Sequence, residues 1–329
     1  MNDKYYYDIK HFPKQFAEGF ELAKDIIVDN NGVPFQRVIL CGMGGSSFFV
    51  KLINDYLATD KTIKFRIQAI KGYSLPLSAD VNTLYFLSSY SGNTEEVLSC
   101  FDEVDTRGFK YVVITSGGEL EARAQAKNAP IFKIPAGIQP RLSTGYFISG
   151  ILRILQNQGL IGDKQAEVLA AAAKIEGSLD ETWAKRLGSS LANRVPIVYS
   201  TDNNSSLALL SKIKFNENSK TQSFCNVFPE LNHNEMVGFA NMIMNPYFII
   251  FKSKFTHSRN YKRIEIFTTL MAEKKLPVEV IDLKGDNILE EILMGYYFID
   301  HVTYYLALAY NIDPEPVKMV ENFKKLLGR

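Results

Sequence analysis

Short apolar runs alternate with amphipathic segments along the first half of the chain. The apolar runs have the length of buried strands and are rich in β-branched and aromatic residues. These predicted strands are 37–41, 65–70, 83–88, 111–115 and 131–134. The segments between and before them have helical spacing, and the predicted helices are 16–27, 46–57, 93–104 and 120–127. Strands that alternate with helices predict a parallel sheet with helices on both faces.

The same alternation returns in the second half, after a helix-rich stretch in which Gly159 and Gly162 mark a break. The predicted strands here are 195–200, 223–227, 248–251 and 278–282. The predicted helices are 146–156, 164–176, 180–193, 207–214, 261–274, 288–310 and a last one ending at 325. A chain of 329 residues has the length of two domains. We therefore expect two α/β domains, residues 1–160 and 161–329, each with a mostly parallel sheet between helices in three layers.

Charge and composition change this picture mainly by excluding partners. The formal net charge is +1, and no run of lysines and arginines is long enough to bind nucleic acid or a membrane surface. No stretch of about 18 apolar residues could span a bilayer, and the first residues do not resemble a signal peptide. Three cysteines without paired spacing predict buried thiols in a reducing compartment. We therefore expect a cytoplasmic protein.

The segment SYSGNTE, which begins at Ser89, follows a predicted strand and precedes a predicted helix. In parallel α/β sheets such loops line the ligand crevice, and the next helix directs unpaired backbone N–H groups into it. Ser89, Ser91 and Thr94 add hydroxyl donors, and Gly92 lets the backbone approach an oxyanion closely. These features predict an anion site. The alternative is ordinary helix capping, with Asn93 as the N-cap residue.

A second loop, CGMGGSS, begins at Cys41 and also joins a predicted strand to a predicted helix. Its glycines allow the backbone to pack against a ligand, as in the dinucleotide fingerprint G-x-G-x-x-G. That fingerprint has a third glycine where this chain has Ser47, and an acidic residue where the next predicted strand ends in Ile70 and Lys71. The loop therefore disfavours a nicotinamide cofactor, and a tight turn without a ligand remains the alternative.

Arg141 closes the segment PAGIQPR, which follows the last predicted strand of the first sheet. The two prolines stiffen this loop, so a guanidinium held there is suited to stabilising a developing oxyanion. The alternative is a solvated arginine on the surface.

Two polar segments flank the predicted strand 223–227: NENSK lies before it and PELNHNE after it. Carboxylates, amides and an imidazole at strand ends suit general acid–base chemistry, and Glu217, Glu230 and Glu235 are all candidates for the base. A metal site at Glu230, His233 and Glu235 does not match the helical H-E-x-x-H spacing. A purely structural network of these side chains is the remaining alternative.

These motifs together resemble one family of sugar-phosphate enzymes. SYSGNTE resembles the phosphosugar-binding signature of sugar isomerase (SIS) domains. With GMGGS, QPR, NENSK, PELNHNE and a C-terminal DPEPV helix, it resembles the bifunctional phosphoglucose/phosphomannose isomerase family over residues 42 to 324. The resemblance implies two SIS-type domains, a hexose 6-phosphate substrate, a homodimer, and no metal or other cofactor.

The resemblance also implies a role for individual residues. Glu217 would be the base that moves a proton between C1 and C2 through a cis-enediol, and Arg141 would stabilise the negative charge of that intermediate. His233 would assist ring opening from the neighbouring subunit. Lys324 would be the C-terminal active-site lysine, with Lys325 as the alternative register. The residues that would hold the substrate phosphate are Gly45, Ser46, Ser89, Ser91 and Thr94.

The implied reaction interconverts glucose 6-phosphate and fructose 6-phosphate. Family members active on mannose 6-phosphate are associated with a threonine near the C-terminal lysine, and residues 311–329 contain none. The mannose activity is therefore the weaker expectation. Two other classes share the SIS loop: enzymes of amino-sugar phosphates and non-enzymatic sugar-phosphate sensors. A sensor would need the phosphate loop but neither Glu217 nor His233.

Overall fold

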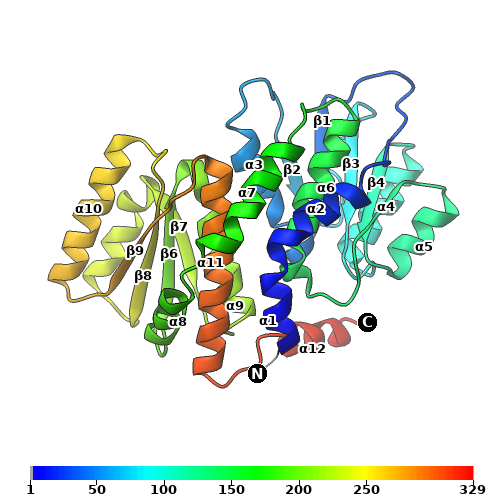
Figure 1. Ribbon diagram of the computed structural model, residues 1–329. Coiled ribbons are helices and arrows are strands. Elements are labelled where there is room, and N and C mark those ends of the chain that lie inside the picture. The colour runs from blue at the N-terminus through cyan, green and yellow to red at the C-terminus, as the bar shows by residue number, and fades with distance from the viewer. Residues whose placement is uncertain (1–2, 329) are drawn as a thin grey trace. The chain divides into compact units, whose positions relative to one another are not determined.

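A computed structural model of the chain describes residues 3–328. The chain divides into two compact units, and their elements are labelled in Figure 1. The N-terminal unit consists of residues 11–177. The C-terminal unit consists of residues 178–328 together with 3–10 at the start of the chain.

The division at residue 177 lies later than the expected division at residue 160. The difference is the helix α7 (Gln165–Ser178), nearly all of which groups with the N-terminal unit. Glu167 of this helix accepts a 2.7 Å hydrogen bond from the hydroxyl of Tyr56, and Lys164 just before it forms a 2.6 Å ion pair with Asp60. These contacts hold α7 against the N-terminal unit.

Five parallel strands form the sheet of the N-terminal unit, in the order β2-β1-β3-β4-β5. They are β1 (Arg37–Gly42), β2 (Ile67–Ile70), β3 (Thr83–Ser88), β4 (Tyr111–Thr115) and β5 (Ile131–Lys133). Every residue of β3 and β4 is buried, as expected for strands covered on both faces. The strand order reverses at β1, since β2 pairs on one side of it and β3 on the other. Such a reversal is where open α/β sheets hold ligands.

Helices cover both faces of this sheet (Figure 1). One face is covered by α4 (Glu95–Thr106) and α5 (Gly118–Ala126). The other helices of the unit are α2 (Phe12–Leu22), α3 (Phe49–Leu57) and α6 (Thr144–Asn157). The rings of Phe49 and Phe147 stack 4.6 Å apart and join α3 to α6.

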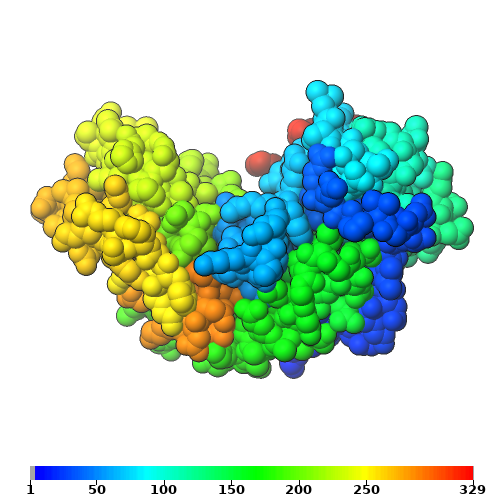
Figure 2. Space-filling model, turned by 90° about the horizontal axis from the view of Figure 1, so that it is seen from above, coloured from blue at the N-terminus to red at the C-terminus, as the bar shows by residue number. Residues whose placement is uncertain are grey.

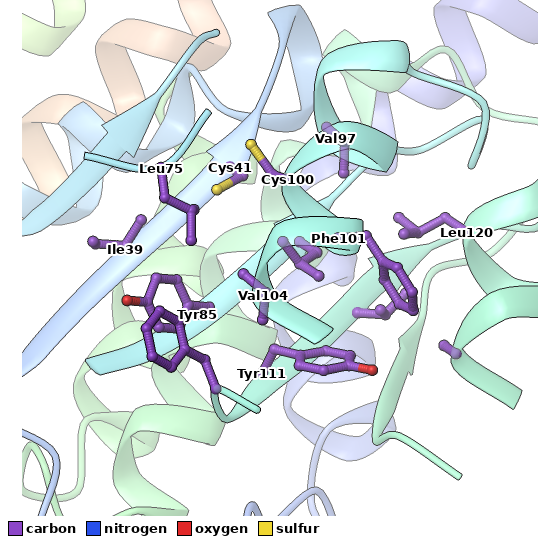
Figure 3. Packing of buried hydrophobic residues seen from close by; sticks show 14 of the residues in the cluster. Ile39, Cys41, Leu75, Tyr85, Val97, Cys100, Phe101, Val104, Tyr111 and Leu120 are labelled. Carbon is purple, nitrogen blue, oxygen red and sulfur yellow. The ribbon is translucent and has the colours of Figure 1, made fainter. Parts of the chain in front are cut away.

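The core beneath α4 contains two cysteines whose sulfur atoms lie close together (Figure 3). Cys41 is the last residue but one of β1 and begins the glycine loop (residues 41–47), and Cys100 lies on α4. The hydrogen bond between the two thiols raises the pKa of Cys41 and lowers that of Cys100. Both are buried, as the sequence predicts, whereas Cys225 is half-buried.

Four parallel strands form the sheet of the C-terminal unit, in the order β7-β6-β8-β9. They are β6 (Val195–Thr201), β7 (Phe224–Phe228), β8 (Pro246–Lys252) and β9 (Val278–Asp282). α10 (Ser258–Glu273) covers one face, where the rings of Phe248 and Phe267 meet edge to face at 5.2 Å. The order reverses at β6 in the same way as it does at β1. The two units therefore share a topology.

Four further helices complete the packed part of the C-terminal unit. α9 (Ser205–Glu217) and α11 (Ile288–Ala309) are in close contact, because Gly295 of α11 leaves room for Leu207 of α9. α8 (Glu181–Ser190) packs on α11 at Gly188, where an added Cβ would lie 2.8 Å from the Val302 carbonyl. α1 (Asp3–Lys10) also packs on α11, through Tyr5, whose ring stacks on that of Tyr304.

The structure confirms a parallel α/β fold, and each of the nine predicted strands is present. The first predicted helix, 16–27, is wrong in its bounds, because α2 begins at Phe12 and ends at Leu22. Pro13 lies in the first turn, where proline removes no helical hydrogen bond, so it does not delay the start of the helix. α1 was not predicted at all. Its eight residues bury Tyr5 and Ile9, too few apolar positions for a recognisable period.

Replacing Gly150 of α6 by alanine should destabilise the protein. A Cβ at this position would lie 2.1 Å from ring atoms of Phe132, so the sheet would have to move away from the helix. Overpacking of this kind costs about 1–3 kcal/mol, which exceeds the gain of up to about 1 kcal/mol in helix propensity. The midpoint of denaturant unfolding would measure the change.

Gly177→Ala in α7 is the matched control, because no atom lies within 4 Å of a Cβ built there. The control should be neutral or slightly stabilising. If Gly150→Ala were equally neutral, the contact between α6 and Phe132 would be looser than described.

Candidate active site

Loops that follow β1 and β3 meet at the point where the strand order of the N-terminal unit reverses. The loop after β1 contains η1 (Gly44–Ser46), a single turn of 3-10 helix. The hydroxyl of Ser88 at the end of β3 donates to the Ser46 carbonyl at 2.8 Å, and the Tyr90 N–H donates to the Ser46 hydroxyl at 2.9 Å. The two loops singled out in the sequence are therefore bonded to each other through Ser46.

Tyr90 joins a third loop to this pair. Its hydroxyl donates to the Pro135 carbonyl at 2.8 Å and accepts from the Ile138 N–H at 3.0 Å. Both partners lie in the loop after β5 that leads to Arg141. No role for Tyr90 was predicted from the sequence, although it is the one aromatic residue of the SYSGNTE segment.

The serine loop, residues 89–95, is held in place by hydrogen bonds within the loop and to neighbouring loops. The hydroxyls of Ser89 and Thr94 lie 2.8 Å apart, and Ser89 is buried while Ser91 is exposed. The N-cap residue of α4 is Thr94, whose side chain makes no capping hydrogen bond among the described residues. Asn93 instead accepts from the Glu119 N–H of α5 at 3.0 Å. The alternative of Asn93 as the cap of α4 is therefore wrong.

Gly92 contributes to the packing of the loops. Its φ is +71°, which favours glycine, and an added Cβ would lie 1.8 Å from the Gly117 carbonyl oxygen. This packing is a reason for glycine in addition to the expected close approach of the backbone to an oxyanion, which stays a prediction. The residue allows the serine loop to lie directly on the loop after β4.

Arg141 lies in η2 (Pro140–Leu142) and is only 2% exposed, so the alternative of a solvated surface arginine is wrong. Its guanidinium donates to the Gln139 side chain at 3.1 Å. Gly45 lies against this turn, since an added Cβ would be 2.8 Å from the Pro140 carbonyl carbon and 2.9 Å from the Arg141 backbone nitrogen. The structure thus brings Gly45, beside Ser46, against the backbone of the turn that carries the buried Arg141.

Glu217 lies in the C-terminal unit, at the last residue of α9, and is half-buried. Its neighbours on either side differ in burial: Asn216 is exposed, whereas Asn218 is fully buried. Lys220 caps the end of this helix, with its ammonium donating to the Glu217 carbonyl and, at 2.8 Å, to the Pro314 carbonyl. The helix end that carries Glu217 is therefore firmly held.

The other two candidate bases make local contacts. Glu235 begins η5 (Glu235–Ala240) and accepts hydrogen bonds from the hydroxyl of Tyr199 and, at 2.6 Å, from the amide of Asn226. Both donors lie on strands, so Glu235 ties the loop to the sheet. Glu230 in η4 (Glu230–Asn232) accepts from Asn234 at 2.6 Å on the surface.

His233 follows η4 directly and is exposed. The alternative of a histidine satisfied inside the core is therefore wrong. Among residues 3–328 there is no group of three or more His, Cys, Asp or Glu side chains that could hold a metal ion.

Lys324 lies in the last turn of α12 (Lys318–Leu326) and is exposed, as is Lys325. No residue of this helix is buried. Its apolar side chains are among the most exposed of the described chain, with Met319 at 87% and Phe323 at 60%.

None of the helices that the structure describes has the length and apolar character of a membrane span.

The parallel topology and the interlocked Ser/Thr loops at the reversal of strand order define a protein of the sugar isomerase (SIS) class. Comparison of the sequence with known proteins leads further. Residues 180–327 match the family described as the bacterial phospho-glucose isomerase C-terminal SIS domain. A bifunctional phosphoglucose/phosphomannose isomerase from Aquifex aeolicus is 32% identical over 99% of both chains. Another from Caldicellulosiruptor bescii is 33% identical over 97% of this chain and 98% of its own. The chain therefore belongs to the bifunctional phosphoglucose/phosphomannose isomerase family.

Solved structures at lower identity agree on the fold. Tagatose-6-phosphate ketose/aldose isomerase from Escherichia coli has a TM-score of 0.68 at 15% identity, covering 94% of each chain. The C-terminal domain of glucosamine-fructose-6-phosphate aminotransferase from Francisella tularensis also has a TM-score of 0.68, at 12% identity, covering 93% of this chain and 95% of its own. The expected double SIS architecture is confirmed.

Gly45→Ala should weaken the binding of a hexose 6-phosphate. The added methyl group would push η1 away from Pro140 and Arg141, the contact that sets the spacing of these loops. If the overpacking of about 1–3 kcal/mol is expressed as lost binding energy, the dissociation constant should rise about 5- to 150-fold. Titration calorimetry with fructose 6-phosphate would measure it.

Gly72→Ala is the control, since nothing lies within 4 Å of a Cβ at that position. Unchanged affinity in Gly45→Ala would remove the contact between η1 and η2 from the account of phosphate binding.

Proposed function

We propose that this protein is an isomerase that interconverts glucose 6-phosphate and fructose 6-phosphate through a cis-enediol intermediate. The observation that carries the proposal is the interlocking of the serine loop, the glycine loop and the turn of Arg141 at one edge of a parallel sheet. Membership of a family whose relatives are named for this activity supports the same reaction.

The substrate phosphate binds to hydroxyls and backbone N–H groups in the N-terminal unit. Backbone amides near a helix start are effective anion ligands, because their dipoles are aligned and need no counterion. The phosphate is remote from the bonds that change, so its binding energy serves to fix C1 and C2 relative to the base. The residues proposed for this role are Gly45, Ser46, Ser89, Ser91 and Thr94.

Glu217 is the proposed base. Moving a proton between C1 and C2 needs a group that accepts it from one carbon and returns it to the next, and a carboxylate can do both. The contacts of Glu235 with Tyr199 and Asn226 give that carboxylate a structural role, which favours Glu217 over it. Glu217 also lies at a firmly held helix end, as precise proton transfer requires.

Arg141 is proposed to stabilise the negative charge of the enediolate. A buried guanidinium interacts with an anion more strongly than an exposed one, because less water screens the charge. Lys324 is the proposed lysine of the C-terminal helix, with Lys325 as the other register. The proposed mechanism uses no metal or other cofactor.

His233 is proposed to assist ring opening in a neighbouring subunit of a homodimer. Its exposure suits a side chain that acts outside its own chain. Large apolar residues near it in sequence are also exposed: Val237 at 73% and Ile243 at 86%. This yellow-green to yellow part of the chain covers an outer face of the C-terminal unit in Figure 2. Exposed apolar residues of this kind suit a protein–protein interface.

The preferred aldose is proposed to be glucose 6-phosphate rather than mannose 6-phosphate, because residues 311–329 contain no threonine. The enzyme is proposed to work in the cytoplasm, where the buried thiols of Cys41 and Cys100 remain reduced.

Glu217→Gln should abolish most of the turnover while leaving substrate binding nearly unchanged. The amide keeps the size of the side chain but cannot accept the proton from carbon. General acid–base groups contribute about 10²–10⁴-fold, so kcat should fall by at least about 100-fold. A coupled assay on fructose 6-phosphate would give kcat, and calorimetry would give the affinity.

Glu230→Gln is the matched control, since Glu230 is an exposed carboxylate of the same type at the other polar segment. It should retain nearly full activity. The assignment fails if Glu217→Gln is as active as the control.

A further inference from the structure

The last turn of α9 is anchored by buried polar side chains that the proposed reaction does not use directly. Lys214 and Asn218 are four residues apart, so they lie on the same face of the helix, and both are fully buried. Glu217 comes between them in sequence, on the flank of that face. Whatever holds Lys214 and Asn218 therefore fixes the backbone from which the Glu217 side chain extends.

Lys214 is held by a buried ion pair with α11. Its ammonium lies 2.6 Å from the Asp300 carboxylate, and both side chains are at most 2% exposed. The same ammonium lies 4.5 Å from the centre of the Tyr296 ring. Burial raises the pKa of Asp300, while the Lys214 ammonium acts to lower it. A buried pair of this kind costs desolvation energy and is weak evidence for stability, so another role for it is reasonable.

Asn218 connects three helices with one amide group. Its Nδ2 donates to the Thr303 hydroxyl of α11 at 2.9 Å, and lies 3.5 Å from Asp300. Its Oδ1 accepts a 2.6 Å hydrogen bond from the Tyr5 hydroxyl of α1. Tyr5 is 1% exposed, and its ring stacks on Tyr304. This contact joins residues 213 positions apart in sequence and is part of the reason that α1 groups with the C-terminal unit.

We propose that Tyr5 and Asn218 are positioning residues for the base Glu217, acting by fixing the last turn of α9 against α1 and α11. The inference rests on the proposed function and adds to it that the first helix of the chain takes part in orienting the base. Proton transfer to carbon is sensitive to position, since a misplacement of about 1 Å can cost about 100-fold in rate. Substrate affinity depends on the phosphate loops of the other unit and should not change.

The test compares two tyrosines of the same helix. Tyr5→Phe removes the hydroxyl that bonds Asn218 and keeps the ring that stacks on Tyr304. Tyr6→Phe is the matched control, because Tyr6 also stacks on Tyr304 but its hydroxyl donates to Glu181 of α8. The full-length protein would be assayed on fructose 6-phosphate at a temperature well below the unfolding midpoint of either variant.

Tyr5→Phe should lower kcat about tenfold with KM changed by less than about twofold, and Tyr6→Phe should leave both nearly unchanged. A double-mutant cycle gives a second criterion. In a protein that already carries Asn218→Ala, Tyr5→Phe should cause no further loss, because residues that act through one contact are not additive. If Asn218→Ala does not fold, the comparison of Tyr5 with Tyr6 decides alone.

Equal kcat values for Tyr5→Phe and Tyr6→Phe would overturn the inference. It would also be overturned if kcat fell in both variants in proportion to the fall in their thermal stability. Glu217→Gln separates this failure from failure of the proposed function. An inactive Glu217→Gln with a fully active Tyr5→Phe means that the positioning alone is wrong. A fully active Glu217→Gln means that the base assignment is wrong.

Discussion

The proposed phosphate site depends on how closely three loops pack at one edge of a parallel sheet. Their spacing is set by backbone contacts that only glycine permits, at Gly45 against Pro140 and at Gly92 against Gly117. Ser46 and Tyr90 then fasten the loops with hydrogen bonds of 2.8 to 3.0 Å. These hydrogen bonds hold the loops in one arrangement, and a preorganised site loses less free energy to ordering when it binds an anion.

The proposed proton transfer between C1 and C2 makes a different demand, since the carboxylate of the base must be held in place. Glu217 is half-buried and lies in the last turn of α9, which is held by the buried ion pair of Lys214 with Asp300 and by Asn218. A rigid helix end gives a carboxylate a fixed direction while leaving it accessible.

The sequence predicted the strands well, because each is a short apolar run between turn residues, and the strand ends located the loops that matter. The sequence also pointed to Arg141. The burial of this side chain could not be predicted, because η1, which packs on the Arg141 turn, is distant from it in sequence. Asn93 shows the limit of local reasoning, since it caps α5 rather than the helix that follows it. Tyr5 shows it again, because its partner Asn218 lies 213 residues away. The choice of Glu217 as the base came from resemblance, not from spacing.

Proton transfer through an enediol can be tested directly by isotope exchange with the solvent. Purified protein would be incubated with fructose 6-phosphate in D₂O containing EDTA, and the aldose product analysed by NMR. A carboxylate base that moves a proton through an enediol exchanges part of it with solvent. We expect that the glucose 6-phosphate formed carries deuterium at C2. We also expect that the rate of its formation is the same with and without EDTA. Absence of aldose product, or product with only protium at C2 at every stage of the reaction, would contradict it.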